Sequence, residues 1–82
     1  MIHQLKTLPP YFYRILEDKK LFEVRKNDRD FQIGDEVELI YFNPEHKNEY
    51  NQPIRVEIIY VLNGGQFGIK KGYCVFGFKI IR

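Results

Sequence analysis

The sequence of 82 residues has one cysteine, no tryptophan and no long apolar run. The single Cys74 excludes an internal disulfide framework and a zinc site built from several cysteines. No apolar stretch approaches the ~18 residues that span a membrane, and the first residues lack the apolar core of a signal peptide. We therefore expect a cytoplasmic protein without membrane association, in which Cys74 is a small buried residue.

Motifs for metals and phosphates are also missing. His3 and His46 do not form a metal pair by their spacing, and the glycine cluster at 64–68 lacks the Gly-Lys-Ser/Thr ending of a phosphate-binding loop. We expect no metal and no cofactor. His3 is predicted to be a structural histidine with satisfied hydrogen bonds, His46 to be solvated, and the glycine cluster to be a turn.

What is present is a globular composition with 44% hydrophobic residues, seven Phe and six Tyr. The length allows a single domain, residues 1–82, with a shallow cleft or surface patch rather than a deep cofactor site. The charge is unevenly spread. Residues 1–34 carry seven cations and five anions, residues 35–57 two and six, and residues 58–82 four and none. If the two basic ends meet in space, one face is positive and suits a phosphate backbone.

Hydrophobic periodicity and turn residues predict a β-α-β-β-β-β order. The expected strands are 3–8, 21–26, 36–42, 54–62 and 73–81, and the expected helix is 11–19. A polar connection is expected at 45–52, and Gly77 is expected to mark a bend or bulge. Because one helix cannot cover both faces of an open sheet, we expect a mainly β (α+β) fold with a curled, barrel-like sheet plugged by the helix.

The alternation along 21–26 places Phe22 and Val24 on one face and Glu23 and Arg25 on the other. We expect the first pair to face the core. The predicted core residues are Phe12, Ile15, Leu16, Phe22, Val24, Val37, Leu39, Val56, Ile58, Tyr60, Val75 and Phe76.

The densest polar stretch surrounds Glu23. Lys20 precedes the strand and can lean over the face that carries Glu23 and Arg25, so that a carboxylate lies between two cations. This cluster can bind amino groups at Glu23 and phosphate at the two cations. A solvated row of ion pairs explains the same spacing.

Two further polar segments carry alternatives. Residues 27–30 are expected to form a turn through their own side chains, with Arg29 in a structural role. Phe67, Lys70, Lys71 and Tyr73 combine aromatic rings with cations, which is typical of surfaces that stack bases, although aromatic residues in so small a domain also belong to cores.

The run Lys19-Lys20-Leu21-Phe22-Glu23-Val24-Arg25, followed by Phe31-Gln32-Ile33-Gly34-Asp35, resembles the ASCH family, named after the human activating signal cointegrator. Its signature is roughly G-x-K-x-x-E-x-R with a later G-D. The chain is most similar to a short phage and bacterial branch, through His3, Leu5, Lys6, the segment 25–31 and the segment 64–68. The glycine of the signature is replaced by Asp18.

The resemblance implies a PUA-like β-barrel with a cleft between the helix and the following strand, and an RNA-binding or modified-nucleotide-binding module without catalytic residues. On that analogy the binding residues are Lys6, Lys20, Glu23, Arg25, Lys26, Arg29, Lys70, Lys71 and Tyr73.

Two alternatives remain. Some small ASCH-like proteins resemble amidohydrolases of acylated nucleosides, which place a Thr nucleophile three residues after a Lys. Lys20 fits that Lys, but Glu23 stands at the nucleophile position. The other alternative is a phage-type module that binds a host protein through Ile40, Phe42 and Ile59, which are expected to lie opposite the core.

Overall fold

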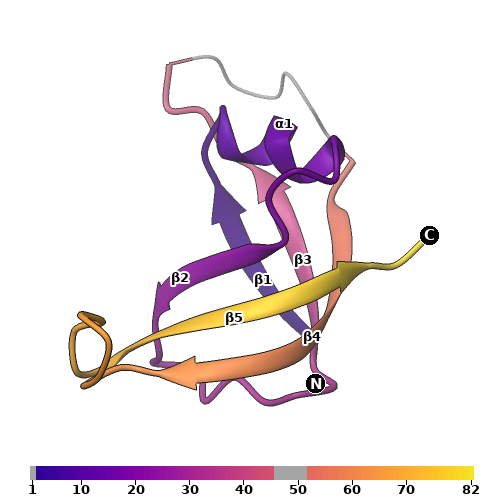
Figure 1. Cartoon of the computed structure of the whole chain (residues 1–82). Helices are drawn as coiled ribbons and strands as arrows, with labels where there is room; N and C mark the ends of the chain where they lie inside the picture. The colour runs from indigo at the N-terminus through magenta and orange to yellow at the C-terminus, as the bar shows by residue number, and fades with distance from the viewer. Residues whose placement is uncertain (1, 46–51) are drawn as a thin grey trace.

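The computed structural model describes residues 2–45 and 52–82, which form five strands and one short helix (Figure 1). The elements are β1 (Ile2–Thr7), α1 (Tyr11–Leu16), β2 (Phe22–Lys26), β3 (Glu36–Tyr41), β4 (Ile54–Asn63) and β5 (Tyr73–Ile80). The predicted mainly β class and the β-α-β-β-β-β order are confirmed. His46 and most of the predicted polar connection 45–52 lie outside the described residues.

The strands form one curled mixed sheet in the order β1-β3-β4-β5-β2, which makes a half-barrel. β1 pairs with β3 in parallel, and the other neighbours are antiparallel. The irregularity expected at Gly77 lies on the opposite strand, because the register shifts between Ile58 and Tyr60, and Tyr60 pairs with Gly77. A bulge increases local twist, which helps β4 to bend around the core.

β1 and β2 are the two edges of the sheet, and side chains rather than a backbone ladder join them. Nη2 of Arg25 donates a hydrogen bond of 2.7 Å to the carbonyl oxygen of Lys6. Nη1 of Arg29 donates one of 2.8 Å to the carbonyl oxygen of Gln4. The turn chemistry predicted for 27–30 is confirmed, because Oδ1 of Asn27 accepts from the amide of Phe31.

The helix lies over one end of the half-barrel and is shorter than predicted. It buries Phe12 and Ile15 against the sheet, whereas Leu16, a predicted core residue, is exposed. The expected helical residues 17–19 instead form a turn in which Asp18 has φ +60°. This left-handed conformation favours glycine and ends a helix, although an aspartate occupies the position here.

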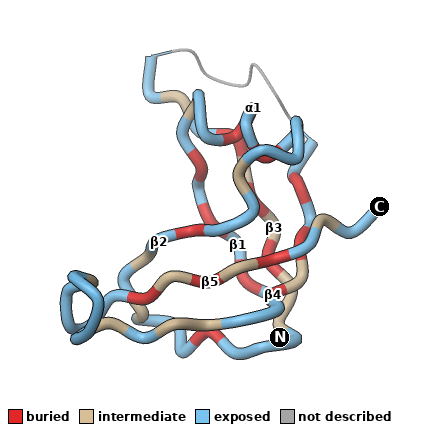
Figure 2. The backbone as a smooth tube through the Cα atoms, in the orientation of Figure 1, coloured by how far each residue is buried: buried red, intermediate tan, exposed pale blue. Residues whose placement is uncertain are grey.

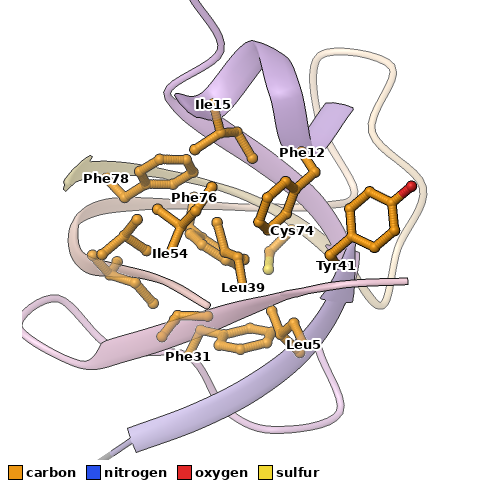
Figure 3. Packing of buried hydrophobic residues seen from close by; sticks show 13 residues of the cluster. Leu5, Phe12, Ile15, Phe31, Leu39, Tyr41, Ile54, Cys74, Phe76 and Phe78 are labelled. Atoms are coloured by element: carbon orange, nitrogen blue, oxygen red, sulfur yellow. The ribbon is translucent and has the colours of Figure 1, made fainter. Parts of the chain in front are cut away.

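The core fills the concave side of the sheet beneath α1 (Figure 3). Seven of the predicted core residues are buried: Phe12, Ile15, Val37, Leu39, Val56, Ile58 and Phe76. The other buried apolar residues are Leu5, Phe31, Tyr41, Ile54, Cys74 and Phe78. Phe31 packs between His3 and Phe76, with ring centroids 4.9 and 5.0 Å away.

The expected facing of β2 is wrong, as is the core assignment of Tyr60. Phe22, Val24 and Tyr60 are exposed, and Val75 is only half-buried, whereas Glu23 is buried (Figure 2). The physical reason is that Lys20 and Arg25 bind the Glu23 carboxylate, so the charged residue can face inward beside the open edge. The alternation fixed which residues share a face but not which face is buried.

Candidate functional site

A cleft of about 310 Å³ lies where the half-barrel is open, between the end of β1, the start of α1 and β2. This is the position at which the resemblance implies a cleft. The residues that line it are Thr7, Leu8, Tyr11, Lys20, Glu23, Val24 and Arg25. It therefore brings together the three residues of the predicted polar cluster.

Glu23 is the centre of the polar cluster. The strand turns its side chain inward, where Oε1 lies 2.6 Å from Nζ of Lys20 and Oε2 lies 2.9 Å from Nε of Arg25. A carboxylate has about four acceptor sites, so two remain for a ligand. The cluster forms one wall of the cleft, with the Glu23 carboxylate bound to both cations.

Lys20 is held in place from several directions. Its ammonium group donates to the carbonyl oxygen of Phe22 at 2.7 Å as well as to Glu23. It also lies 5.7 Å from the ring centroid of Tyr11 and 5.0 Å from that of Phe22. The two hydrogen bonds use two of its three donors, and the third has no acceptor among the described residues.

Arg25 has a double role at the cleft. Nε binds Glu23 and Nη2 binds the β1 carbonyl of Lys6, which fixes the plane of the guanidinium group. Nη1 has no acceptor among the residues that the structure describes. A fixed guanidinium group with free donors is well suited to a planar acceptor or a phosphate.

Thr7 was not predicted as a site residue. It is 2% exposed and lines the cleft, and its hydroxyl has no hydrogen-bond partner within the described part of the chain. A buried hydroxyl without a partner costs free energy, so such groups are rare unless something else binds them. The only sequence signal is the alternation His3-x-Leu5-x-Thr7, which predicts that Thr7 faces inward.

The other predicted binding residues lie outside this cleft. Lys6 lies over the ring of Phe42, 4.8 Å from its centroid, and Arg29 binds the backbone of β1. Lys70 and Tyr73 line a second, shallow depression of about 340 Å³ with Val24, which also lines the first cleft. Lys26 and Lys71 are exposed.

The basic ends of the sequence do meet in space, because β2 and β5 are neighbours and Lys26 pairs with Tyr73. The protein-binding alternative named three apolar residues, of which Phe42 and Ile59 are exposed and Ile40 is half-buried.

The remaining polar and reactive groups are structural. His3 donates a hydrogen bond of 2.9 Å to Asp35, as expected of a satisfied histidine. Cys74 is fully buried, and this burial raises the pKa of its thiol, so it is a poor nucleophile. Across residues 2–45 and 52–82 no group of three or more His, Cys, Asp or Glu side chains could hold a metal, and no helix could cross a membrane.

The chain belongs to the family described as "Domain of unknown function (DUF3850)", whose model matches residues 2–78. This match covers β1 to β4, all but the last two residues of β5, and every residue of the cleft. No curated protein matches the sequence significantly.

Proposed function

We propose that this protein is a non-enzymatic, ASCH-like module that binds RNA or a modified nucleotide, with an unpaired base held in the cleft beside Glu23. The observation that carries the proposal is the buried hydroxyl of Thr7, which lines the cleft without a partner. A ligand with a polar edge would give this hydroxyl the hydrogen bond that the described protein does not.

The polar groups around the cleft complement the edge of a base. Glu23 can accept from an exocyclic amine, while Lys20 and Arg25 can donate to a carbonyl, a ring nitrogen or a phosphate oxygen. Tyr11 is half exposed at the cleft and provides an aromatic surface for stacking. Two cations and one carboxylate leave an excess positive charge, which favours an anionic ligand.

The same contacts favour binding over amide hydrolysis. Both oxygens of Glu23 accept hydrogen bonds from cations, which lowers the nucleophilicity of the carboxylate. Lys20 is bound to that carboxylate and to the Phe22 backbone rather than to a hydroxyl. The cluster therefore supports a recognition surface better than an activated nucleophile.

The test is fluorescence anisotropy with labelled single-stranded RNA of mixed sequence over a salt series. We expect the affinity to fall steeply with salt, and each of Lys20→Ala and Arg25→Ala to weaken binding about tenfold and to reduce the slope of log affinity against log salt by about 0.7. Lys79→Ala is the matched control, because Lys79 is an exposed lysine near the far end of β5 and lines neither depression.

The proposal fails if wild-type affinity ignores salt, or if Lys20→Ala and Arg25→Ala bind RNA as tightly as Lys79→Ala. Oligomers of a single base, compared in the same assay, test whether Glu23 binds the exocyclic amine of the base. Adenine, cytosine and guanine carry an exocyclic amine for Glu23 and uracil does not, so uridine oligomers should bind most weakly.

A further inference from the structure

Phe22, Val24 and Tyr60, which were assigned to the core but are exposed, share one face of the sheet. In the register of β2, β5 and β4, Phe22 and Tyr60 both pair with Gly77, and Val24 and Leu62 both pair with Val75. Residues that pair directly point to the same side of a sheet. The outer face of these three strands is therefore a continuous apolar surface, and it ends at Tyr73.

This outer face is exposed where an antiparallel sheet would normally be polar. Tyr60 is 61% exposed and Val24 56% exposed, and Phe22 and Tyr73 are also exposed. Gly77 lies between Phe22 and Tyr60, so no side chain separates these two rings. Contiguous exposed apolar surface with a polar rim marks an interaction site.

The rim of this face is basic. Lys20 precedes β2 by two residues and Lys26 ends it, and Lys70 and Lys71 lie in the loop before β5. From Tyr60 to Arg82 the sequence contains no acidic residue, and neither do the outward positions 22, 24 and 26 of β2. Lys70 lies 5.8 Å from the ring centroid of Tyr73, so a cation and an aromatic ring already face one solvent region.

The loop between β4 and β5 extends this surface with an aromatic tip. Phe67 is 83% exposed and has φ +52°, an unfavourable conformation for a residue with a side chain. The loop is held by hydrogen bonds from Gly64 to Tyr73 and from Gly65 to Ile69. A Cβ atom at Gly64 would collide with backbone oxygens, so the loop packs tightly on its own backbone.

The outer face is continuous with the cleft. Val24 lines both the cleft and the second depression, whose other residues are Gly68, Ile69, Lys70, Tyr73 and Val75. A ligand that leaves the cleft past Val24 therefore reaches Tyr73 and the loop without crossing an acidic side chain. Figure 1 shows this loop extending beyond the start of β5 and the end of β2.

We infer that the outer face of β2, β5 and β4, together with Phe67, is a stacking platform for a single-stranded nucleic acid. Bases stack on Phe22, Tyr60 and Tyr73, and the lysines of the rim contact the phosphates. The inference rests on the proposed function, because the same strand inserts one base into the cleft. It makes the ligand a polymer rather than a free nucleotide.

Charge favours this occupant over a second copy of the chain. A symmetric dimer through the outer face would place the same patch on both subunits, and so bring the four lysines of one copy against those of the other. A polyanion neutralises these lysines, and its bases supply flat apolar surfaces for the rings.

The test measures the affinity of the full chain for a labelled single-stranded RNA of about ten nucleotides. Tyr60→Leu removes the ring but keeps an apolar side chain, whereas Tyr60→Phe keeps the ring. We expect Tyr60→Leu and Phe67→Ala each to weaken binding about tenfold, and Tyr60→Phe to bind within twofold of wild type. Ile33→Ala is the control, because Ile33 is exposed and lines neither depression.

The outcomes separate the two proposals. The cleft variants here are Arg25→Ala and Thr7→Val, because Lys20 also borders the platform. If these cleft variants weaken binding but Tyr60→Leu and Phe67→Ala do not, the platform is wrong and the cleft stands. If the platform variants weaken binding and the cleft variants do not, the base-binding cleft is wrong and the platform stands. A dimer in size-exclusion chromatography that Tyr60→Leu dissociates, without effect on RNA affinity, would also overturn the platform.

Discussion

His3 and Glu23 are two buried polar residues, each 5% exposed, and they lie in regions of opposite character. His3 binds Asp35, and Asp35 also accepts from the backbone amide of Gln32 at 3.1 Å. The ring of Phe31 packs on His3 with its edge or face, at a centroid distance of 4.9 Å. Glu23 also has two partners, but it faces a cleft that Thr7 lines as well, and the Thr7 hydroxyl has no partner within residues 2–45 and 52–82.

The comparison shows that burial and charge do not by themselves separate a structural ion pair from a binding site. What differs is whether the surrounding polar groups are satisfied and whether space is left beside them. Around His3, Nε2 and the Asp35 carboxylate are hydrogen-bonded, and the ring of Phe31 packs on the imidazole. Around Glu23 acceptor sites, donors and a hydroxyl remain in a cleft of about 310 Å³.

The largest expected effect is a loss of stability when the His3–Asp35 pair is removed. His3→Ala removes the aromatic contact with Phe31 and the hydrogen bond between Nε2 of His3 and the Asp35 carboxylate. We expect the free energy of unfolding in urea to fall by about 3 kcal/mol. RNA affinity at a temperature where the variant is folded should stay within twofold of wild type. A loss of affinity as large as that of Lys20→Ala would show that the two regions are not independent.

Glu23→Gln tests whether Glu23 belongs to a binding site. The carboxamide keeps the shape but loses the charge that Lys20 and Arg25 bind. We expect RNA affinity to fall at least tenfold, while the free energy of unfolding falls by only about 1–2 kcal/mol, because both cations keep contact with water. Their side chains are 19% and 26% exposed. A large stability loss with unchanged affinity would make Glu23 a structural residue like His3.

Thr7→Val sharpens the comparison further, since it replaces an unsatisfied hydroxyl by a methyl group of similar size. We expect the free energy of unfolding to stay equal or to rise by up to about 1 kcal/mol, and RNA affinity to fall about tenfold. Thr7→Ser keeps the hydroxyl and is the control for affinity. If Thr7→Val destabilises the protein, the hydroxyl has a structural partner and the main support for the cleft is lost.

The smallest expected effect is the pH dependence of the His3–Asp35 pair. Partial burial alone would raise the pKa of Asp35, but hydrogen bonds from His3 and from the Gln32 amide outweigh it and hold the pKa below its ordinary 3.8. The carboxylate therefore stabilises the fold fully above about pH 4, and this contribution is lost as the pH falls through the lowered pKa.

Urea unfolding of wild type and Asp35→Asn between about pH 6 and pH 3 measures this contribution. The difference in unfolding free energy should shrink toward the acidic end. A difference that is independent of pH would mean that the ionised carboxylate is not what stabilises the pair.

The sequence predicted the fold class because period-two alternation and turn residues are local signals. The strands at 54–62 and 73–81 differ from β4 and β5 by a single residue at the end. The facing of β2 was not predictable, since alternation gives two sets of residues and hydrophobicity chose the wrong one. Only the tertiary contacts of Glu23 with Lys20 and Arg25 reverse that choice.

The site was predictable in part. The spacing of Lys20, Glu23 and Arg25 indicated a cluster, and these residues do lie within hydrogen-bonding distance of one another. Thr7 and Tyr11 were missed because they lie outside the polar segment 20–25. In the sequence they appear as an ordinary strand residue and an ordinary helix residue. The apolar outer face of β2, β5 and β4 was missed because the sequence pattern of an apolar strand face is the same whether that face is exposed or buried.

The two arginines that join β1 to β2 have a consequence for the behaviour of the protein in solution. A strand at the edge of a sheet presents unpaired carbonyl groups that can recruit a strand from another molecule. On β1 the carbonyls of Gln4 and Lys6 are already occupied by Arg29 and Arg25. The same guanidinium groups therefore protect this edge from pairing with a strand of another molecule. Arg25→Ala would free the carbonyl group of Lys6 for such pairing and would also alter the cleft.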